Sequence, residues 1–129
     1  MFFKKRAKHL ALGVKGEKAA LKEMQRLGLD ILHKNFAIHD VGEIDIIARD
    51  GACVVFTEVK TRRQKGKSRA GEAVDREKRQ KIWKTAKYYL KRTGCKTLRY
   101  RFDVVEVYIY SPWHKEVRYL ANAYDQESF

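Results

Sequence analysis

Carboxylates and one lysine interrupt two short apolar segments between residues 42 and 60. The first segment carries Glu43 and Asp45, and the second ends in Glu58-Val59-Lys60. Carboxylate oxygens with no Cys or His beside them suit Mg²⁺ or Mn²⁺ and not zinc. A lysine two residues beyond a ligand can stabilise charge on a phosphate oxygen, or orient and help deprotonate an attacking water. In a strongly basic chain, this set fits phosphodiester hydrolysis better than acyl or glycosyl transfer.

The two segments are predicted to form a hairpin, because Asp50-Gly51 between them is a strong turn signal. A two-residue turn there pairs position 48 with 53, 45 with 56 and 43 with 58. Since side chains alternate along a strand, Glu43, Asp45, Glu58 and Lys60 are predicted to share one face of the sheet. Facing carboxylates repel one another, so this cluster must lie in water or hold a cation.

A further carboxylate precedes the hairpin on a predicted helix. Helical periodicity runs from about Leu10 to Leu27, with Gly28 as the stop signal and with Ala20, Leu21, Met24 and Leu27 on the apolar stripe. Counting back along the stripe puts Glu17 on it. On the residues alone two explanations are equal: Glu17 lies near the helix start, where the macrodipole and solvent tolerate it, or it is aimed at the hairpin cluster.

After Lys60 the chain loses its apolar periodicity and becomes strongly basic, which predicts a loop. Ten basic and three acidic residues lie from residue 60 to residue 81. This charge begins at the edge of the acidic cluster, which favours a role in holding phosphates. The predicted nucleic-acid-binding residues are Arg62, Arg63, Lys65, Lys67, Arg69 and Lys78.

The longest helical pattern covers residues 72–92 and ends before Gly94. Its predicted inner face consists of Val74, Ile82, Ala86, Tyr89 and Leu90. Lys78 lies four residues before Ile82 and is therefore predicted to point to that face. Packing of its stem with a solvated ammonium is one explanation. Contact with the acidic cluster or with a substrate phosphate is the other.

A long strand is predicted over residues 98–110, and residues 117–121 can pair back with it after Ser111-Pro112. The order strand, helix, strand favours a crossover connection and a parallel pair. Asp103 faces the same way as Val105, and a structural hydrogen-bonding role is favoured over catalysis. The loop residue His39 is expected to be exposed in preference to acting as a ligand.

The composition predicts one domain over residues 1–129, with residues 1–12 as a basic arm. Lys and Arg total 29 against 16 Asp and Glu, a formal net charge of +13. This excess calls for an anionic partner, usually nucleic acid. A membrane partner is disfavoured because no apolar run is long enough to span a bilayer. The apolar stretch near the N-terminus is also too short for a signal peptide. We expect a cytoplasmic protein whose Cys53 and Cys95 are free thiols.

The spacing of Asp45 and Glu58-Val59-Lys60 resembles the D…(D/E)xK site of restriction-endonuclease-like nucleases, a superfamily that includes archaeal Holliday junction resolvases. The order of blocks from about residue 13 to residue 107 resembles, more specifically, the bacterial YraN-type endonuclease family. The blocks are G-x-x-G-E at Gly13 to Glu17, Asn35, G-E-I-D at Gly42 to Asp45, E-V-K-T-R at Glu58 to Arg62, G-E-A-V at Gly71 to Val74, Lys78, and R-F-D-V-V at Arg101 to Val105.

This resemblance implies an α/β fold with a three-layer restriction-endonuclease-like core, a mixed sheet flanked by helices in the order αβββαββ. It implies Mg²⁺ or Mn²⁺ bound by Asp45 and Glu58, the Val59 carbonyl nearby, and Lys60 at the attacking water. In resolvase-like members a glutamate of the first helix completes the metal site, and Glu17 stands at that place. The implied activity is endonucleolytic cleavage of DNA, with branched or flapped structures among the candidate substrates.

Three alternatives stay open at this point. The chain could bind nucleic acid on a nuclease fold without cleaving it, and nothing separates RNA from DNA as the partner. A homodimer is also open, because the aromatic residues Phe2, Phe3, Tyr108, Tyr110 and Trp113 could supply an interface or pack in a core.

Overall fold

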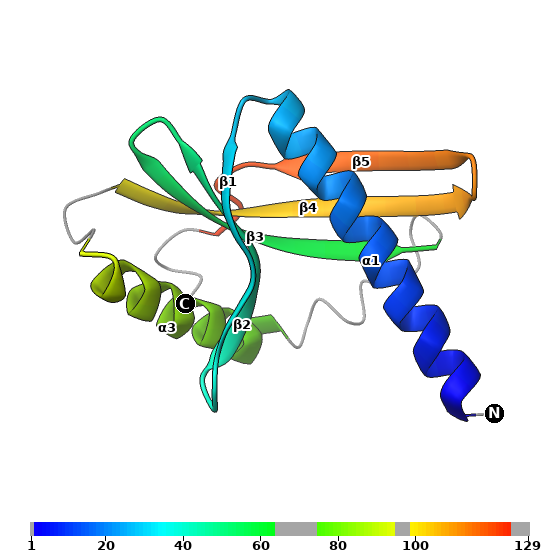
Figure 1. Cartoon of the computed structure of the whole chain (residues 1–129), viewed down its shortest axis with the longest axis horizontal. Helices are drawn as coiled ribbons and strands as arrows, with labels where there is room; N and C mark the ends of the chain where they lie inside the picture. The colour runs from blue at the N-terminus through cyan, green and yellow to red at the C-terminus, as the bar shows by residue number, and fades with distance from the viewer. Residues whose placement is uncertain (1, 64–74, 95–98, 125–129) are drawn as a thin grey trace.

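In the part of the chain that the structure describes, a five-stranded mixed sheet lies at the centre and one helix covers each of its faces (Figure 1). The computed structural model describes residues 2–63, 75–94 and 99–124, and their side chains from residue 11 onward except that of residue 75. The elements are α1 (Phe2–Arg26), β1 (Asp30–Ile38), β2 (Gly42–Asp50), β3 (Cys53–Arg62), α3 (Asp75–Arg92), β4 (Arg99–Ser111) and β5 (His114–Leu120). This is the predicted αβββαββ order and α/β class.

The strands lie in the sheet in chain order, β1-β2-β3-β4-β5. β3 and β4 are parallel, and every other neighbouring pair is antiparallel. The connection between β3 and β4 contains α3, as a parallel pair requires. The predicted crossover and parallel pair are thus confirmed. β5 pairs back onto β4, with Val117 opposite Val107, as the sequence predicted for residues 117–121.

α1 begins earlier than predicted, at Phe2 instead of about Leu10. Residues 2–12, part of the predicted basic arm of residues 1–12, belong to this helix. Ala20 and Met24 are fully buried on the stripe, but Leu27 is 47% exposed because the helix has already ended at Arg26. Gly28 follows in the left-handed region, with φ of 86°, which favours glycine.

The hairpin register differs from the predicted one by one residue on each strand. Asp50 pairs with Cys53 and Ile47 with Phe56, so the turn residues are Gly51 and Ala52. The predicted pairs 48–53, 45–56 and 43–58 were wrong because Gly51, with φ of 59°, occupies the first turn position and not the second. The summed shift is two residues, an even number, so Ile47 and Phe56 still point to the same face.

Two hydrophobic clusters separate the layers. One packs α3 on the sheet through Ile82, Ala86, Tyr89 and Leu90, the predicted inner face of that helix. The other packs α1 on the opposite side through Ala20 and Met24. Val74, the remaining predicted inner residue, lies outside the described residues. No helix in the described ranges is long and apolar enough to cross a lipid bilayer.

Candidate active site

The regular pairing of β2 with β3 stops next to Asp45. Ile46 pairs with Thr57, and Oδ2 of Asp45 then accepts a hydrogen bond of 2.8 Å from the Val59 amide. Side-chain alternation also breaks here: Ile44 packs with the cluster under α3, whereas Ile46 packs with the cluster under α1. Asp45 therefore lies at the point where β2 separates from β3, and its carboxylate bridges the opening. The simple alternation from Glu43 through Asp45 to Ile47 that the sequence predicted was wrong at this point.

Glu58 lies on β3 beside this opening and faces α3. It is only 7% exposed, and its Oε1 lies 2.6 Å from Nζ of Lys78. Its other oxygen, Oε2, accepts a 3.3 Å hydrogen bond from the Tyr124 hydroxyl. A hollow of about 150 Å³ on this side of the sheet is lined by Glu43, Ile44, Asp45, Thr57, Glu58, Lys78 and Ile82. Of the two explanations for Lys78, contact with the acidic cluster is confirmed.

Glu17 approaches Asp45 from the other face of the sheet. A hollow of about 230 Å³ there is lined by Gly13, Val14, Glu17, Asn35, Asp45, Val59 and Thr61. Asp45 lines both hollows, so the three carboxylates surround the gap between β2 and β3. Oε1 of Glu17 is buried and has no hydrogen-bond partner among the described residues. The position of Glu17 therefore agrees with the explanation that aims it at the cluster. The other explanation placed Glu17 near the helix start, but α1 begins at Phe2, fifteen residues earlier.

Gly16 explains how Glu17 comes so close. A Cβ at residue 16 would lie 1.7 Å from Oγ1 of Thr61 and 2.8 Å from its Cβ and Cγ2. Any side chain at that position would overlap the end of β3, so only glycine allows α1 this near the strand. The next residue on α1 is Glu17. The close packing of α1 on β3 thus places the glutamate at the sheet opening.

The electrostatics of the cluster favour a bound cation. Burial is the largest cause that raises the pKa of Asp45, to about 6, against the lowering effect of the Val59 amide. The charges of Glu58 and Glu17 raise it further, and Lys78 opposes them. Burial also raises the pKa of Glu17, and Glu43 adds to this, while Lys34 and a hydrogen bond from Asn35 oppose it. The charged forms of Asp45 and Glu17 are thus disfavoured, first by burial and then by neighbouring carboxylates.

The donor set suits a hard divalent cation with few protein ligands. Within the described ranges no group of three or more His, Cys, Asp or Glu side chains is arranged to hold a metal ion. Mg²⁺ does not need such a cage, because it usually keeps several waters and takes one or two carboxylates. Asp45 and Glu58 can supply these, and the unpartnered Oε1 of Glu17 is a further acceptor. The residues present therefore fit Mg²⁺ or Mn²⁺, although Lys78 already neutralises Glu58.

The basic residues of the predicted site differ in burial and in their distance along the chain from the two hollows. Lys60 follows Glu58 by two residues on β3 and is half-buried, but it does not line either hollow. Arg62 is half-buried at the end of β3, and Arg63 is exposed after it. The remaining predicted loop residues, Lys65, Lys67 and Arg69, lie outside the described residues.

Asn35 and Tyr124 were not predicted to contribute to the site from their own chemistry. Asn35 lies on β1 between Lys34, which pairs with Ile46, and Phe36, which pairs with Ile44. Its φ is 53°, and its side chain hydrogen-bonds Glu17. Asparagine tolerates this left-handed conformation better than most residues, which is the signal available in the sequence. Tyr124 follows β5 and reaches Glu58 across 66 positions of the chain, and no sequence signal indicates that contact.

Two other candidates are accounted for outside the site. Asp103 is 1% exposed and accepts hydrogen bonds from Arg101, from the Tyr119 hydroxyl and from the Asn122 amide. This agrees with the favoured structural role. The His39 side chain is 96% exposed and lies 3.4 Å from Asp40, away from both hollows, as expected for a loop histidine.

Residues 16–107 match a family model described as "Uncharacterised protein family UPF0102". This span contains Glu17, Asp45, Glu58 and Lys78. The chain belongs to UPF0102. The family is the one that the ordered sequence blocks predicted as YraN-type, so that prediction is confirmed.

Curated relatives that are named UPF0102 proteins are similar to this chain over most of its length. One from Caldicellulosiruptor saccharolyticus is 43% identical over 98 residues, which cover 76% of this chain and 82% of the relative. One from Geobacter sulfurreducens is 40% identical over 114 residues, 88% of each chain. One from Alkaliphilus metalliredigens is 36% identical over 114 residues, 88% of this chain and 97% of the relative. The matched span, residues 16–107, contains every residue that lines the two hollows except Gly13 and Val14.

Proposed function

We propose that the chain is an Mg²⁺- or Mn²⁺-dependent endonuclease that hydrolyses phosphodiester bonds of DNA. The observation that carries this proposal is the convergence of Asp45, Glu58 and Glu17 on the gap between β2 and β3. Burial and the charges of Glu58 and Glu17 raise the pKa of Asp45, and such a buried acidic group has no use in binding a polyanion directly. A divalent cation beside Asp45 relieves the repulsion. The formal net charge of +13 supplies the attraction for nucleic acid that the acidic site lacks.

Each residue has a distinct task in this proposal. The bound cation would act as a Lewis acid on a phosphate oxygen and its bound water. Asp45 and Glu58 would hold the cation with the Val59 carbonyl, and the Val59 amide fixes the orientation of the Asp45 carboxylate. Glu17 would accept hydrogen bonds from waters around the cation. The Lys60 ammonium would orient the attacking water, and Lys78 would leave Glu58 to pair with a phosphate oxygen.

Cleavage of defined DNA tests the proposal. Purified protein with Mn²⁺ should cut at least one of linear, flapped and four-way duplexes, and Asp45→Ala and Glu58→Gln should abolish the cutting. Lys60→Met should slow it by roughly 10²- to 10⁴-fold, the range for a residue that assists proton transfer. Glu116→Gln, on the exposed surface of β5, is the matched control and should cut as wild type does. Failure of all three duplexes to be cut, or full activity of Asp45→Ala, would refute the proposal.

The alternative function is nucleic-acid binding without cleavage. The ion pair between Lys78 and Glu58 favours it, because an ammonium already neutralises one of the two proposed metal ligands. Calorimetry separates the two functions: salt-dependent DNA binding with no uptake of Mn²⁺ supports the binder, and Mn²⁺ uptake that Asp45→Asn removes supports the nuclease. An RNA duplex of the same sequence in both assays decides which nucleic acid is the partner.

A further inference from the structure

The exposed side of α3 is rich in basic residues. From Lys78 to Arg92 the exposed positions are basic, glutamine or tyrosine, and none is acidic. The basic ones are Lys78, Lys81, Lys84, Lys87, Lys91 and Arg92. Spacings of three and four residues put side chains on one side of a helix. We call Lys81, Lys84, Lys87 and Lys91 the lysine ridge.

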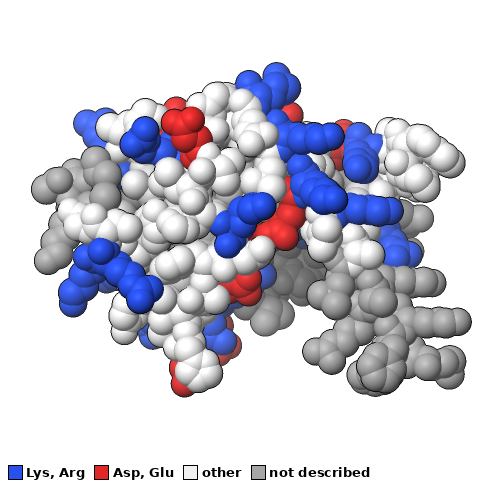
Figure 2. Space-filling model, in the orientation of Figure 1, with Lys and Arg blue, Asp and Glu red and all other residues white. Residues whose placement is uncertain are grey.

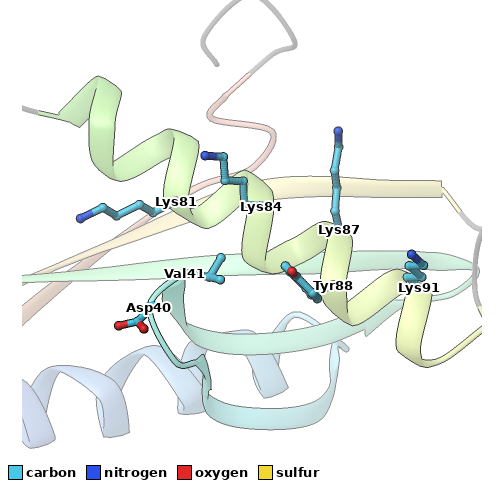
Figure 3. A pocket seen from close by; sticks show the side chains of 7 residues that line it. All are labelled: Asp40, Val41, Lys81, Lys84, Lys87, Tyr88 and Lys91. Carbon is cyan, nitrogen blue, oxygen red and sulfur yellow. The ribbon is translucent and has the colours of Figure 1, made fainter.

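The lysine ridge borders a hollow of about 540 Å³ between α3 and the turn from β1 to β2 (Figure 3). The ridge lysines, Tyr88, Val41 and Asp40 line it. In Figure 3 the four lysines are spread along α3, and Tyr88 projects from the same helix towards the turn that carries Asp40 and Val41. Asp40 is the acidic residue of this lining, and it lies 3.4 Å from His39.

Most ridge lysines have no partner among the described residues that explains their charge. Within the described part of the chain, the side chains of Lys81, Lys84 and Lys91 form no ion pair and no ring contact. Lys87 lies 4.6 Å from the centre of the Trp83 ring, a cation–π contact that leaves its charge in place. Like charges one turn apart destabilise a helix. An anionic ligand would remove that cost.

The lysine ridge leads directly to the candidate active site. Lys78 precedes Lys81 by one helical turn, and it contacts Glu58 in the hollow shared with Asp45. From Lys78 to Lys91 the helix advances roughly 20 Å, at about 1.5 Å per residue. One DNA strand advances about 3.4 Å along the helix axis per phosphate. The ridge is thus long enough to follow several consecutive phosphates away from the site.

A lipid surface fits this helix less well. A helix that lies in a membrane interface needs an apolar face to insert. The apolar face of α3 is already used, because Ile82, Ala86, Tyr89 and Leu90 are buried against the sheet. Figure 2 shows lysine and arginine side chains on the surface over one end of α3 and elsewhere on this face, where acidic side chains lie next to some of them.

We infer that the lysine ridge binds the phosphate backbone of duplex DNA and directs it to the acidic site. The inference rests on the proposed function for its partner, but it concerns binding and not cleavage. It also adds a DNA contact on α3 to the contact that the sequence predicts for the basic segment after β3.

DNA binding by a cleavage-deficient protein tests the inference. The background is Asp45→Asn without divalent cations, and the probe is a fluorescein-labelled 20-base-pair duplex followed by anisotropy over a series of NaCl concentrations. The ridge variant is Lys81→Gln/Lys84→Gln/Lys91→Gln. The control variant is Lys22→Gln/Lys115→Gln/Arg118→Gln. It also removes three positive charges, but from exposed positions of α1 and β5. Circular dichroism and thermal unfolding verify that both variants fold.

The ridge variant should bind the duplex roughly tenfold or more weakly at low salt than the background protein. Its plot of log K against log salt concentration should be shallower by about 2 to 3, since each lost phosphate contact removes about 0.9. The control variant should keep both values. Equal losses of binding in the two variants would mean that net charge alone causes the loss, and they would overturn the inference. An unchanged ridge variant would also overturn it, as would a background protein that does not bind the duplex.

Two further readouts separate this inference from others. If the ridge variant loses binding to phosphatidylserine vesicles and keeps binding to the duplex, the partner is a membrane and the inference is wrong. If wild-type protein cuts no DNA while the ridge variant alone loses duplex binding, the nuclease proposal fails and the inference stands.

Discussion

The Lys78 ammonium on α3 lies 2.6 Å from Oε1 of Glu58 on β3, so one of the proposed metal ligands is paired with a cation from the protein itself. Lys78 remains 62% exposed, whereas the Glu58 side chain is 8% exposed. Lysine can therefore leave this pair for solvent or a phosphate at little cost, but Glu58 cannot leave its buried position. This asymmetry makes Lys78 the movable partner.

Replacement of Lys78 should destabilise the metal-free protein. Lys78→Gln leaves the buried Glu58 without its cation, and we expect a loss of about 1–2 kcal/mol in the free energy of unfolding, because the partly exposed ammonium makes the pair weaker than a fully buried one. Urea unfolding in EDTA measures the loss. Excess Mn²⁺ should restore most of it by taking the place of the ammonium. Lys81→Gln, one turn further along α3, should change the stability by less than about 0.5 kcal/mol. No loss in EDTA would mean that the pair contributes nothing, and a loss that Mn²⁺ does not repair would argue against a metal at Glu58.

Asp45→Asn should stabilise the metal-free protein in a pH-dependent manner. The pKa of Asp45 is raised to about 6 from an ordinary value of 3.8, so its ionised form is disfavoured in the folded state. The cost is fully present above about pH 6 and disappears as the pH falls below about 4. Asparagine can still accept the hydrogen bond from Val59. We expect a gain of about 1–2 kcal/mol at pH 7.5 and none at pH 4, measured by urea unfolding in EDTA. Asp30→Asn, exposed at the start of β1, is the control and should show no such dependence. An equal effect at both pH values would contradict the cost of ionising Asp45 in the folded protein.

A side chain at residue 16 should separate α1 from β3. Gly16→Ala places a Cβ 1.7 Å from Oγ1 of Thr61, and we expect a loss of about 2–3 kcal/mol in the free energy of unfolding. Gly13→Ala, one turn earlier on α1, meets no atom within 4 Å and should raise stability by about 0.5–1 kcal/mol through helix propensity. Thermal unfolding compares the two. Adding Thr61→Ala to Gly16→Ala should recover part of the loss, because it removes Oγ1 and Cγ2. Equal behaviour of the two alanine variants would rule out the close contact.

The sequence by itself determined the elements and much of the chemistry of the candidate site. Period-two patterns placed β2 and β3, helical periodicity placed the buried side of α3, and the crossover rule gave the parallel pair of β3 and β4. These features follow from backbone geometry within one element or between neighbours in the chain. The same alternation predicts that Glu58 and Lys60 share one face of β3.

Only the tertiary structure decided how the site closes. The approach of Glu17 depends on the contact of Gly16 with Thr61, and the partner of Glu58 depends on where α3 packs. The hairpin register and the break in alternation at Asp45 depend on the Gly51 conformation and the Val59 amide. Such contacts join residues far apart in the chain, and local propensity does not encode their distance or direction. Packing of the two helices on the sheet fixes them, and with them the positions of three carboxylates around one opening.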